Sequence, residues 1–357
     1  MASWGVNLRS LEYTGRDWME QVVKFKPDTP LCMAHIPGSH DSGTFWLNIS
    51  KGLARDQQYL KYLRPFDFGC ISKFTCRWSK TQSLTFLEQL NLGIRYLDIR
   101  TEVTLDDDII EDVMKVQKGS KIYNKIRDWI LPRRRGFIKR LYSFATRAFI
   151  VHGLYGVSCD QMFDDVYNFL KKNPGEVVIL DFNHVYNMNE KDFLKHVMQR
   201  YIRKYDVKFL CKNTVNLRIV DIRELQRLDQ RLILIGPYKN PIHDHLFSST
   251  SIKSPWPNVD KVCDLEEHLK HEVRKPFHTG LRVIQGNLTA RISDIITSPK
   301  ETLKESYSIP ARDCVVDWVK HINGAELWHT NIVTADEVNP EFSDVVISRN
   351  FEQIKWK

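Results

Sequence analysis

The sequence predicts a single α/β domain built as a distorted parallel (β/α)8 barrel of the TIM type. Short apolar runs of strand length alternate with helical patterns from one end of the chain to the other. These runs lack a regular polar alternation, which is typical of parallel strands covered on both faces. With about eight such runs, a closed barrel is the simplest architecture. An open doubly wound sheet is the alternative, but no Gly-x-Gly-x-x-Gly or phosphate-loop motif supports it.

We divide the chain into an N-terminal segment at 1–29, a barrel at 30–338 and a helix at 339–357 that packs on the barrel. The first strand is expected at 31–36 and should end at Pro37 and Gly38, because proline lacks a ladder N–H and glycine accepts a sharp turn.

The remaining elements follow from apolar periodicity and from breakers. Further strands are expected at 94–100, 148–153, 176–184, 231–237, 281–288 and 331–336. Helices are expected at 53–63, 83–90, 160–170, 189–201, 221–228, 259–273, 312–322 and from 341 onwards. Residues 66–80 are expected to be irregular, and Ser83 is expected to cap the helix at 83–90.

Residues 112–147 form an insert in which basic side chains alternate with aromatic and aliphatic ones. Apolar residues at helical spacing on both sides of Pro132 predict amphipathic helices whose basic face suits an anionic membrane surface. A charged linker or a helix docked on the barrel is the alternative. The residues assigned to membrane contact are Arg133, Arg134, Arg135, Trp129 and Phe137.

Charge and cysteine usage narrow the class of protein. The net charge of +8 and the pI near 9.0 suggest a polyanionic partner, either an anionic membrane or a nucleic acid. Seven scattered cysteines without a Cys-x-x-Cys pair predict reduced thiols. Neither a signal peptide nor a run of roughly 20 apolar residues is present. We therefore expect a cytoplasmic protein, peripheral to membranes, with no metal or other cofactor.

Polar residues lie at the carboxyl ends of several expected strands. In a barrel these ends meet at one mouth, so we expect the side chains to converge there. Two imidazoles and a guanidinium suit phosphoryl transfer by acid–base catalysis, and neighbouring carboxylates orient the imidazoles. The converging residues are His40, Asp41, Asp98, Arg100, His152, Asp181, Asn183 and Asp336.

Five motifs carry a resemblance to a known family. They are HIPGSHDSGTF at 35–45, RYLDIR at 95–100, VHG at 151–153, EVVILDFNH at 176–184 and NIVTAD at 331–336. Together they resemble the X domain of phosphatidylinositol-specific phospholipase C, as found in small eukaryotic proteins that consist of little more than that domain. The match covers about 30–338 in the expected order, and the first motif is the most specific.

The resemblance implies a distorted barrel that cleaves phosphatidylinositol in two acid–base steps, the first giving diacylglycerol and an inositol 1,2-cyclic phosphate. It makes His40 the general base on the inositol 2-hydroxyl and His152 the general acid for the diacylglycerol oxygen. Asp41 would support this acid and Arg100, and Asp336 would be the partner of His40.

The resemblance also bears on metal dependence and on substrate contacts. Calcium-dependent relatives carry an acidic ligand where Arg100 stands, and a guanidinium cannot ligate calcium because it has no lone pair to offer. Asp98 belongs to the same electrostatic cluster. We assign Asp181, Asn183 and Trp256 to substrate contacts, although bacterial relatives carry a lysine at the strand that contains Asp181, so the headgroup contacts should differ.

Three other functions remain open. A catalytically weak inositide- or membrane-binding scaffold would not need both His40 and His152. Barrel phosphodiesterases that act on other lipids are built around a metal bound by carboxylates, for which Arg100 is the wrong residue. A nucleic-acid binder would use the basic insert, but no nucleic-acid module accompanies it, and we expect no nucleic-acid partner.

Overall fold

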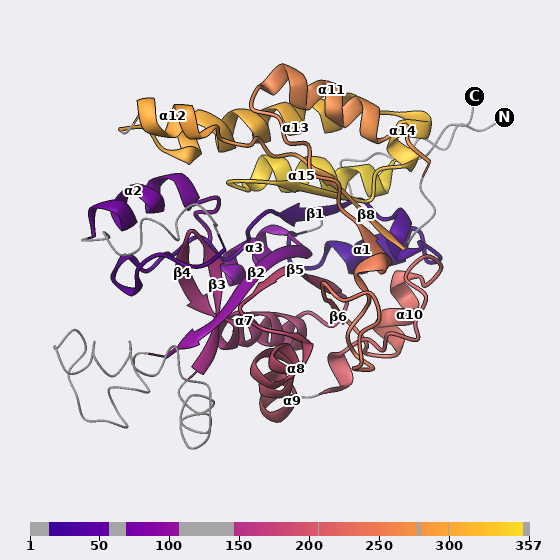
Figure 1. Cartoon of the computed structure of the whole chain (residues 1–357). Helices are drawn as coiled ribbons and strands as arrows, with labels where there is room; N and C mark the ends of the chain where they lie inside the picture. Colours follow the sequence, from indigo (N-terminus) through magenta and orange to yellow (C-terminus); the bar gives the residue numbers. More distant parts are fainter. Residues whose placement is uncertain are drawn as a thin grey trace.

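The computed structural model describes residues 14–56, 69–106, 146–205, 207–276, 280–298 and 300–352. A nine-stranded curved sheet lies at its centre, between helices on both sides (Figure 1). The strands are β1 Ile36–Ser39, β2 Tyr96–Leu105, β3 Thr146–His152, β4 Leu154–Ser158, β5 Val178–Tyr186, β6 Leu232–Ile235, β7 Ile252–Lys253, β8 Leu281–Gln285 and β9 Ile332–Ala335.

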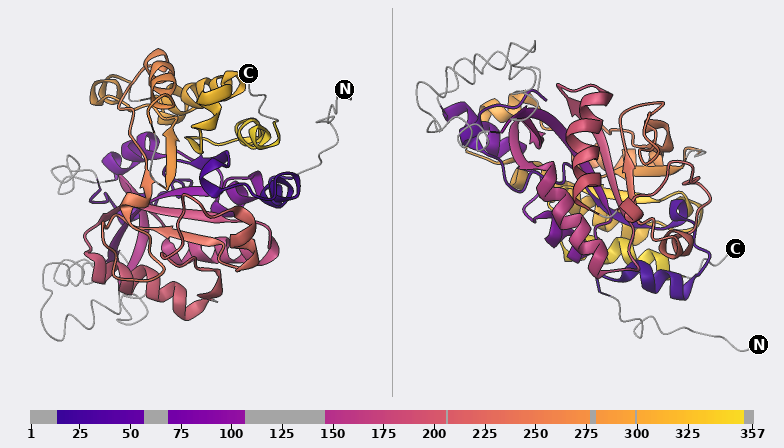
Figure 2. Two further views of the ribbon diagram at one scale, coloured as in Figure 1. Left: turned by 90° about the vertical axis from the view of Figure 1, so that its right-hand side faces the viewer. Right: turned by 90° about the horizontal axis from the view of Figure 1, so that it is seen from below.

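Helices cover the sheet on both sides: those that follow residue 260 lie above it in Figure 1 and in the left view of Figure 2, and those at 159–204 lie below it. Up to residue 227 the helices are α1 Trp18–Phe25, α2 Cys70–Ser79, α3 Phe86–Leu92, α7 Cys159–Lys172, α8 Glu190–Phe193, α9 Gln199–Lys204 and α10 Ile222–Arg227. After residue 260 they are α11 Val262–Glu272, α12 Ile292–Thr297, α13 Ile309–His321, α14 Gly324–Trp328 and α15 Pro340–Ser348. Two short 3-10 turns matter below, η2 Leu31–Met33 and η10 Arg349–Phe351.

Strand side chains alternate between two hydrophobic clusters, as the period of two requires. Ile36, Tyr96 and Ile179 point inwards and meet residues from β6, β8 and β9 in one cluster. Their chain neighbours Leu97 and Leu180 point outwards, into a larger cluster with the covering helices. The sheet therefore encloses one core and carries a second on its outer surface, which is the organisation of a barrel.

The barrel is distorted where β6 and β7 meet. The parallel strands run in the order β6-β5-β2-β1-β9-β8-β7. No ladder joins β6 to β7 in the described part of the chain. Instead, Ile235 at the end of β6 makes a single parallel bridge to Phe247, whose side chain lies in the inner cluster. Packing of Phe247 thus fills the place where a regular barrel would have paired strands.

The hairpin β3–β4 departs from the all-parallel arrangement that the sequence predicts. β3 pairs antiparallel with the second half of β2, from Thr101 opposite Ile150 to Leu105 opposite Thr146. β3 begins at Thr146 opposite Leu105, the last residue of β2, and from there it runs back along β2. Consequently, β1 flanks the first half of β2 and β3 flanks the second half on the same edge.

The first predicted strand is displaced along the chain. Residues 31–33 form the 3-10 turn η2, and β1 begins at Ile36 and contains both Pro37 and Gly38. Pro37 pairs with β9 where β2 has not yet begun, so its missing N–H costs no ladder bond there. At Gly38 an added Cβ would lie 2.8 Å from a side-chain atom of Tyr96, so glycine permits the close approach of β1 to β2.

Two other local predictions are wrong. Residues 70–79, expected to be irregular, form the helix α2. The cap of α3 is Thr85 instead of Ser83: Thr85 and Glu88 form a capping box, in which each side chain accepts from the other residue's backbone N–H. Both the insert at 112–147, apart from its last two residues, and most of the predicted helix at 53–63 lie outside the described residues. Within the described ranges, none of the helices is long and apolar enough to span a bilayer.

Candidate active site

The loop after β1 holds two site residues in a fixed conformation. His40 and Asp41 follow the last residue of β1 directly, and Asp41 has a φ of 43°, in the left-handed region. The buried side chain of Gln82 donates to the carbonyls of His40 and Ala335 at 3.0 Å each, which ties the loop to the end of β9. Because non-glycine residues adopt this φ only when their surroundings enforce it, the loop is held by its contacts.

β2 directs a carboxylate and a guanidinium towards that loop. Alternation places Asp98 and Arg100 on the face that Tyr96 also occupies. The Nε atom of Arg100 lies 2.7 Å from Oδ1 of Asp41, and a terminal nitrogen lies 3.1 Å from Nε2 of His40. Asp98 accepts from the backbone N–H of Asp41 at 3.3 Å. Arg100 therefore contacts both of the residues that follow β1.

His152 reaches the same place from the antiparallel strand β3. Since β3 runs back along β2, its last residue arrives at the end of β1. The Nδ1 atom of His152 lies 2.7 Å from the carbonyl oxygen of Ser79 in α2, so Nδ1 is the donor. Its Nε2 faces Oδ2 of Asp41 at 3.4 Å, and Nε2 of His40 lies 3.3 Å from that same oxygen. One carboxylate oxygen thus stands between the two imidazoles.

Asp336 holds the opposite side of His40. It follows β9, and its Oδ1 lies 2.8 Å from Nδ1 of His40. Asn287 donates to Oδ1 at 2.7 Å and Ser308 donates to Oδ2 at 2.9 Å, so both oxygens are fixed. Because Nδ1 donates to Asp336, Nε2 is the nitrogen of His40 that is left to exchange a proton at the site.

Sequence reasoning missed Gln82, Asn287 and Ser308. Asn287 comes two residues after β8, so the rule that found the other strand-end polar residues could have found it. Gln82 lies ahead of α3 and Ser308 immediately ahead of α13, where no pattern in the sequence marks a link to a distant strand. Their roles depend on tertiary contacts alone.

The electrostatics of the cluster favour charged forms of its central residues. Burial by itself would lower the pKa of His40, but Asp41 and Asp336 outweigh it and raise that pKa to about 9. Burial would raise the pKa of Asp41, but Arg100 and His152, together with His40, lower it to about 2. Asp41 is therefore ionised throughout the physiological range.

Nε2 of His40 faces a donor and an acceptor at once. A neutral ring can accept from Arg100 at 3.1 Å, and a protonated ring can donate towards Asp41 at 3.3 Å. The site therefore accommodates both protonation states of His40 without a change of position. A residue that first takes a proton and later returns it requires this property.

The residues assigned to substrate contacts occupy different depths. Trp256 is 39% exposed, and its ring lies 5.0 Å from that of His40, so it borders the open side of the cluster. Asn183 is partly buried and donates to Asp98 at 2.8 Å. Asp181 is buried under Tyr96, whose hydroxyl donates to it at 2.7 Å; burial and the charge of Asp98 raise its pKa to about 7.

The cluster contains one set of groups with the spacing of a metal site. Atoms of His40, Asp41 and Asp98 lie within 4.8 Å of one another. Arg100 contacts two of these three residues, and its fixed positive charge competes with any cation for the same oxygens. The donor set therefore fits a guanidinium better than a calcium ion, which needs six to eight oxygen ligands. The residues assigned to membrane contact in the insert lie outside the described part of the chain.

Curated proteins and solved structures resemble this chain along nearly its whole length. No model of a protein family matches the chain. The chain is 27% identical over 344 residues to mouse PI-PLC X domain-containing protein 2, and the alignment covers 95% of this chain and 88% of the relative. It is 26% identical over 341 residues to human PI-PLC X domain-containing protein 3, and this alignment covers 94% of this chain and 93% of the relative.

Solved structures show the same fold. Phosphatidylinositol-specific phospholipase C from Listeria monocytogenes superimposes with a TM-score of 0.57 at 16% identity, over 94% of this chain and 99% of that one. Phosphatidylinositol-specific phospholipase C from Staphylococcus aureus, solved in a study of its membrane binding, superimposes with a TM-score of 0.56 at 14% identity. This superposition covers 94% of this chain and 97% of that one. These likenesses confirm the predicted barrel class. Along nearly its whole length the chain is thus homologous to the PI-PLC X domain-containing proteins, and the resemblance that its motifs indicated is confirmed.

Proposed function

We propose that the protein is a phospholipase C-type phosphodiesterase that cleaves phosphatidylinositol to diacylglycerol and inositol 1,2-cyclic phosphate. The observation that carries the proposal is the pair of imidazoles, His40 and His152, at 3.3 and 3.4 Å from one oxygen of Asp41, with Arg100 beside them. An acid and a base on either side of a phosphate, with a cation between them, are the groups that in-line phosphoryl transfer needs.

In the first step the neutral form of His40, whose share grows as the pH rises towards the His40 pKa of about 9, takes the proton of the inositol 2-hydroxyl on Nε2, and that oxygen attacks phosphorus. The bond from phosphorus to the diacylglycerol oxygen breaks, and His152 gives its Nε2 proton to the leaving oxygen. Asp336 stabilises the imidazolium that forms on His40, since it already holds Nδ1 at 2.8 Å. In a second step water opens the cyclic phosphate, with the two histidines in exchanged roles.

Arg100 supplies the fixed positive charge of the reaction. Its planar group can donate to the equatorial phosphate oxygens while Nε remains 2.7 Å from Asp41. Buried charge of this kind acts without reorganisation, so we propose that the reaction needs no calcium. The catalytic role of Asp98 is indirect: it holds Asn183 and the backbone of Asp41 in place.

We further propose that the enzyme is cytoplasmic and acts as a peripheral protein on a membrane that contains inositol phospholipid. Exposed apolar side chains follow strands whose carboxyl ends form the site: Trp46 after β1 is 51% exposed, and Ile292 and Ile296 on α12 after β8 are 59% and 67% exposed. Such side chains can enter the interface of a bilayer. The basic residues of the insert, Arg133 to Arg135, would add attraction to anionic lipid at about 1 kcal/mol per charge.

The test is phosphorus NMR of the purified protein with phosphatidylinositol vesicles, with and without EGTA. We expect a cyclic inositol phosphate signal that persists in EGTA and is lost in both His40→Ala and His152→Ala. His271→Ala, which removes an exposed histidine on α11, serves as the matched control and should keep full activity. Binding to the vesicles without any product would instead identify a membrane-binding scaffold, and loss of the signal in EGTA would refute the role of Arg100.

A further inference from the structure

A second pocket opens at the amino end of β1, at the opposite end of the barrel from the active site. Its volume is about 600 Å³, and we call it the basal pocket. The connection from α1 to β1, the helix α14 and the turn η10 form its walls. The lining residues that matter here are Lys26, Pro30, Met33, His35, Trp328 and Arg349.

Two cations in the basal pocket keep N–H donors that no hydrogen bond within the described residues uses. Lys26 donates to the carbonyls of Asn350 and Glu352 at 3.0 and 2.8 Å, which occupies two of the three N–H groups of its ammonium. Arg349 pairs with Glu352 through one terminal nitrogen and donates to the carbonyl of Ile322 through the other. Its Nε is buried and has no hydrogen-bond partner in the part of the chain that the structure describes.

His35 adds a third polar group at the same place. His35 is 7% exposed, and its Nδ1 is buried without a hydrogen-bond partner among the described residues. Asn350 accepts from its backbone N–H and donates to its carbonyl, both at 2.8 Å, so the ring position is fixed. Burial, together with the charges of Arg349 and Lys26, lowers the pKa of His35 to about 4, so the ring is neutral at pH 7.

The charges of these groups do not cancel. Lys26 and Arg349 carry one positive charge each, and among the described residues Glu352 has the one carboxylate recorded in contact with either of them. Asp28 also lines the pocket, but its carboxylate pairs with Arg223 on α10. One positive charge therefore remains in a partly enclosed site, where an unpaired charge is costly. An anion beside the two cations would remove that cost.

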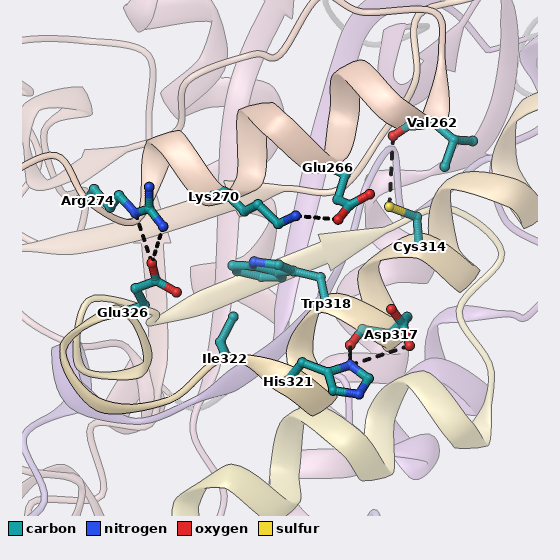
Figure 3. A pocket seen from close by; sticks show the side chains of 10 residues that line it. All are labelled: Val262, Glu266, Lys270, Arg274, Cys314, Asp317, Trp318, His321, Ile322 and Glu326. Carbon is teal, nitrogen blue, oxygen red and sulfur yellow. Dashed lines mark hydrogen bonds and ion pairs between the residues drawn. The ribbon is translucent and has the colours of Figure 1, made fainter.

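A second groove on the molecule shows the contrast. It lies between α11 and α13, has a volume of about 460 Å³, and has Trp318 at its floor (Figure 3). Its cations have carboxylate partners in its own walls: Lys270 pairs with Glu266, and Arg274 pairs with Glu326 (Figure 3). That groove has no surplus charge to attract an ion, whereas the basal pocket has one.

We propose that the basal pocket binds a small organic anion, a carboxylate or a phosphate ester, whose oxygens meet Lys26 and Arg349. The apolar part of the ligand would pack on Pro30, Met33 and the ring of Trp328. Both kinds of anion offer the same oxygens, and these apolar side chains suit a short alkyl chain. The site is separate from the catalytic one and does not depend on the proposed activity.

The experiment is calorimetric titration of the full-length protein with octyl phosphate, octanoate and inorganic phosphate, each below any micelle concentration. We expect at least one amphiphile to bind and inorganic phosphate to bind more weakly, because the phosphate ion lacks the apolar part. Comparison of octyl phosphate with octanoate identifies the headgroup. Binding should persist in His40→Ala, which separates the basal pocket from the catalytic phosphate site.

Two variants locate the binding. Arg349→Met should weaken it by at least about tenfold, because a hydrogen bond to a charged group is lost. Met33→Trp should abolish ligand binding because the larger side chain fills the pocket. This variant tests the proposal independently if Arg349→Met does not fold. Arg227→Met, which removes an exposed arginine paired with Glu224 on α10, should bind like the wild type. Absence of binding by both amphiphiles, equal binding in Met33→Trp, or loss in His40→Ala would overturn the proposal.

Discussion

Replacement of Asp336 by asparagine should lower the pKa of His40 by at least about one pH unit. The wild-type pKa of about 9 exceeds the ordinary 6.5 by an amount that corresponds to roughly 3 kcal/mol in favour of the imidazolium. Asp41 at 3.3 Å and Asp336 at 2.8 Å supply that energy against the opposing effects of burial and Arg100. If the two carboxylates contribute comparably, loss of the Asp336 charge removes about half of it.

The assay is NMR titration of isotope-labelled histidine, with the His40 signal identified from the spectrum of His40→Ala. Asp28→Asn, which removes an exposed carboxylate at the other end of the barrel, is the matched control and should leave the titration unchanged. A wild-type His40 that titrates near 6.5, or an equal pKa in Asp336→Asn, would refute the reasoning.

The same pKa predicts how stability depends on pH. The folded-state pKa of His40 lies above the unfolded value of 6.5, so protonation stabilises the fold fully below about pH 6.5. This contribution is lost as the pH rises through about 9. The melting temperature of Asp336→Asn should therefore fall furthest below the wild type under pH 6.5 and should approach it above pH 9. An equal difference at both extremes would contradict the linkage.

Three further changes test other parts of the account. Arg100→Lys should lower kcat/KM by about 10² to 10³ with little change in melting temperature, because one ammonium cannot replace a planar group that contacts two partners. Gly38→Ala should destabilise the fold by about 1–3 kcal/mol in denaturant titrations, since the new methyl meets Tyr96 and Thr334 at 2.8 and 3.0 Å. Thr85→Ala should cost about 1 kcal/mol in the same measurement through loss of the α3 cap.

Much of the fold could be predicted because local patterns and tertiary structure agree. The apolar run 176–184 and the periodic helix 160–170 correspond to β5 and α7 with ends shifted by a few residues. Placing polar residues at strand ends likewise brought His40 and Asp336 together, because β1 and β9 are parallel neighbours and their carboxyl ends face the same way. Arg100 lies midway along β2, which runs on to Leu105 instead of ending at residue 100 as predicted.

The rest could not be predicted because it depends on contacts between distant segments. No local pattern in the sequence shows that β3 is antiparallel. The prediction placed His152 at the site as the end of a parallel strand, whereas His152 reaches the site because β3 runs back along β2. The sequence alone predicts a strand end at Pro37 and Gly38. The strand accommodates both residues because β2 pairs with β1 only from Gly38 onwards, and because glycine leaves room for the ring of Tyr96. The support of Asp336 by Ser308 joins positions far apart in the chain, and only the folded structure reveals it.

The central claim is that His40 is the base and His152 the acid of one phosphodiesterase site. The most direct test compares two soluble inositol phosphodiesters in EGTA, one with an alkyl leaving group and one with a nitrophenyl leaving group. A nitrophenolate needs no proton to leave, so His152→Ala should regain most of its lost rate on that substrate, whereas His40→Ala should remain slow on both. Equal losses of the two variants on both substrates, or no turnover of either substrate by the wild-type protein, would contradict the account.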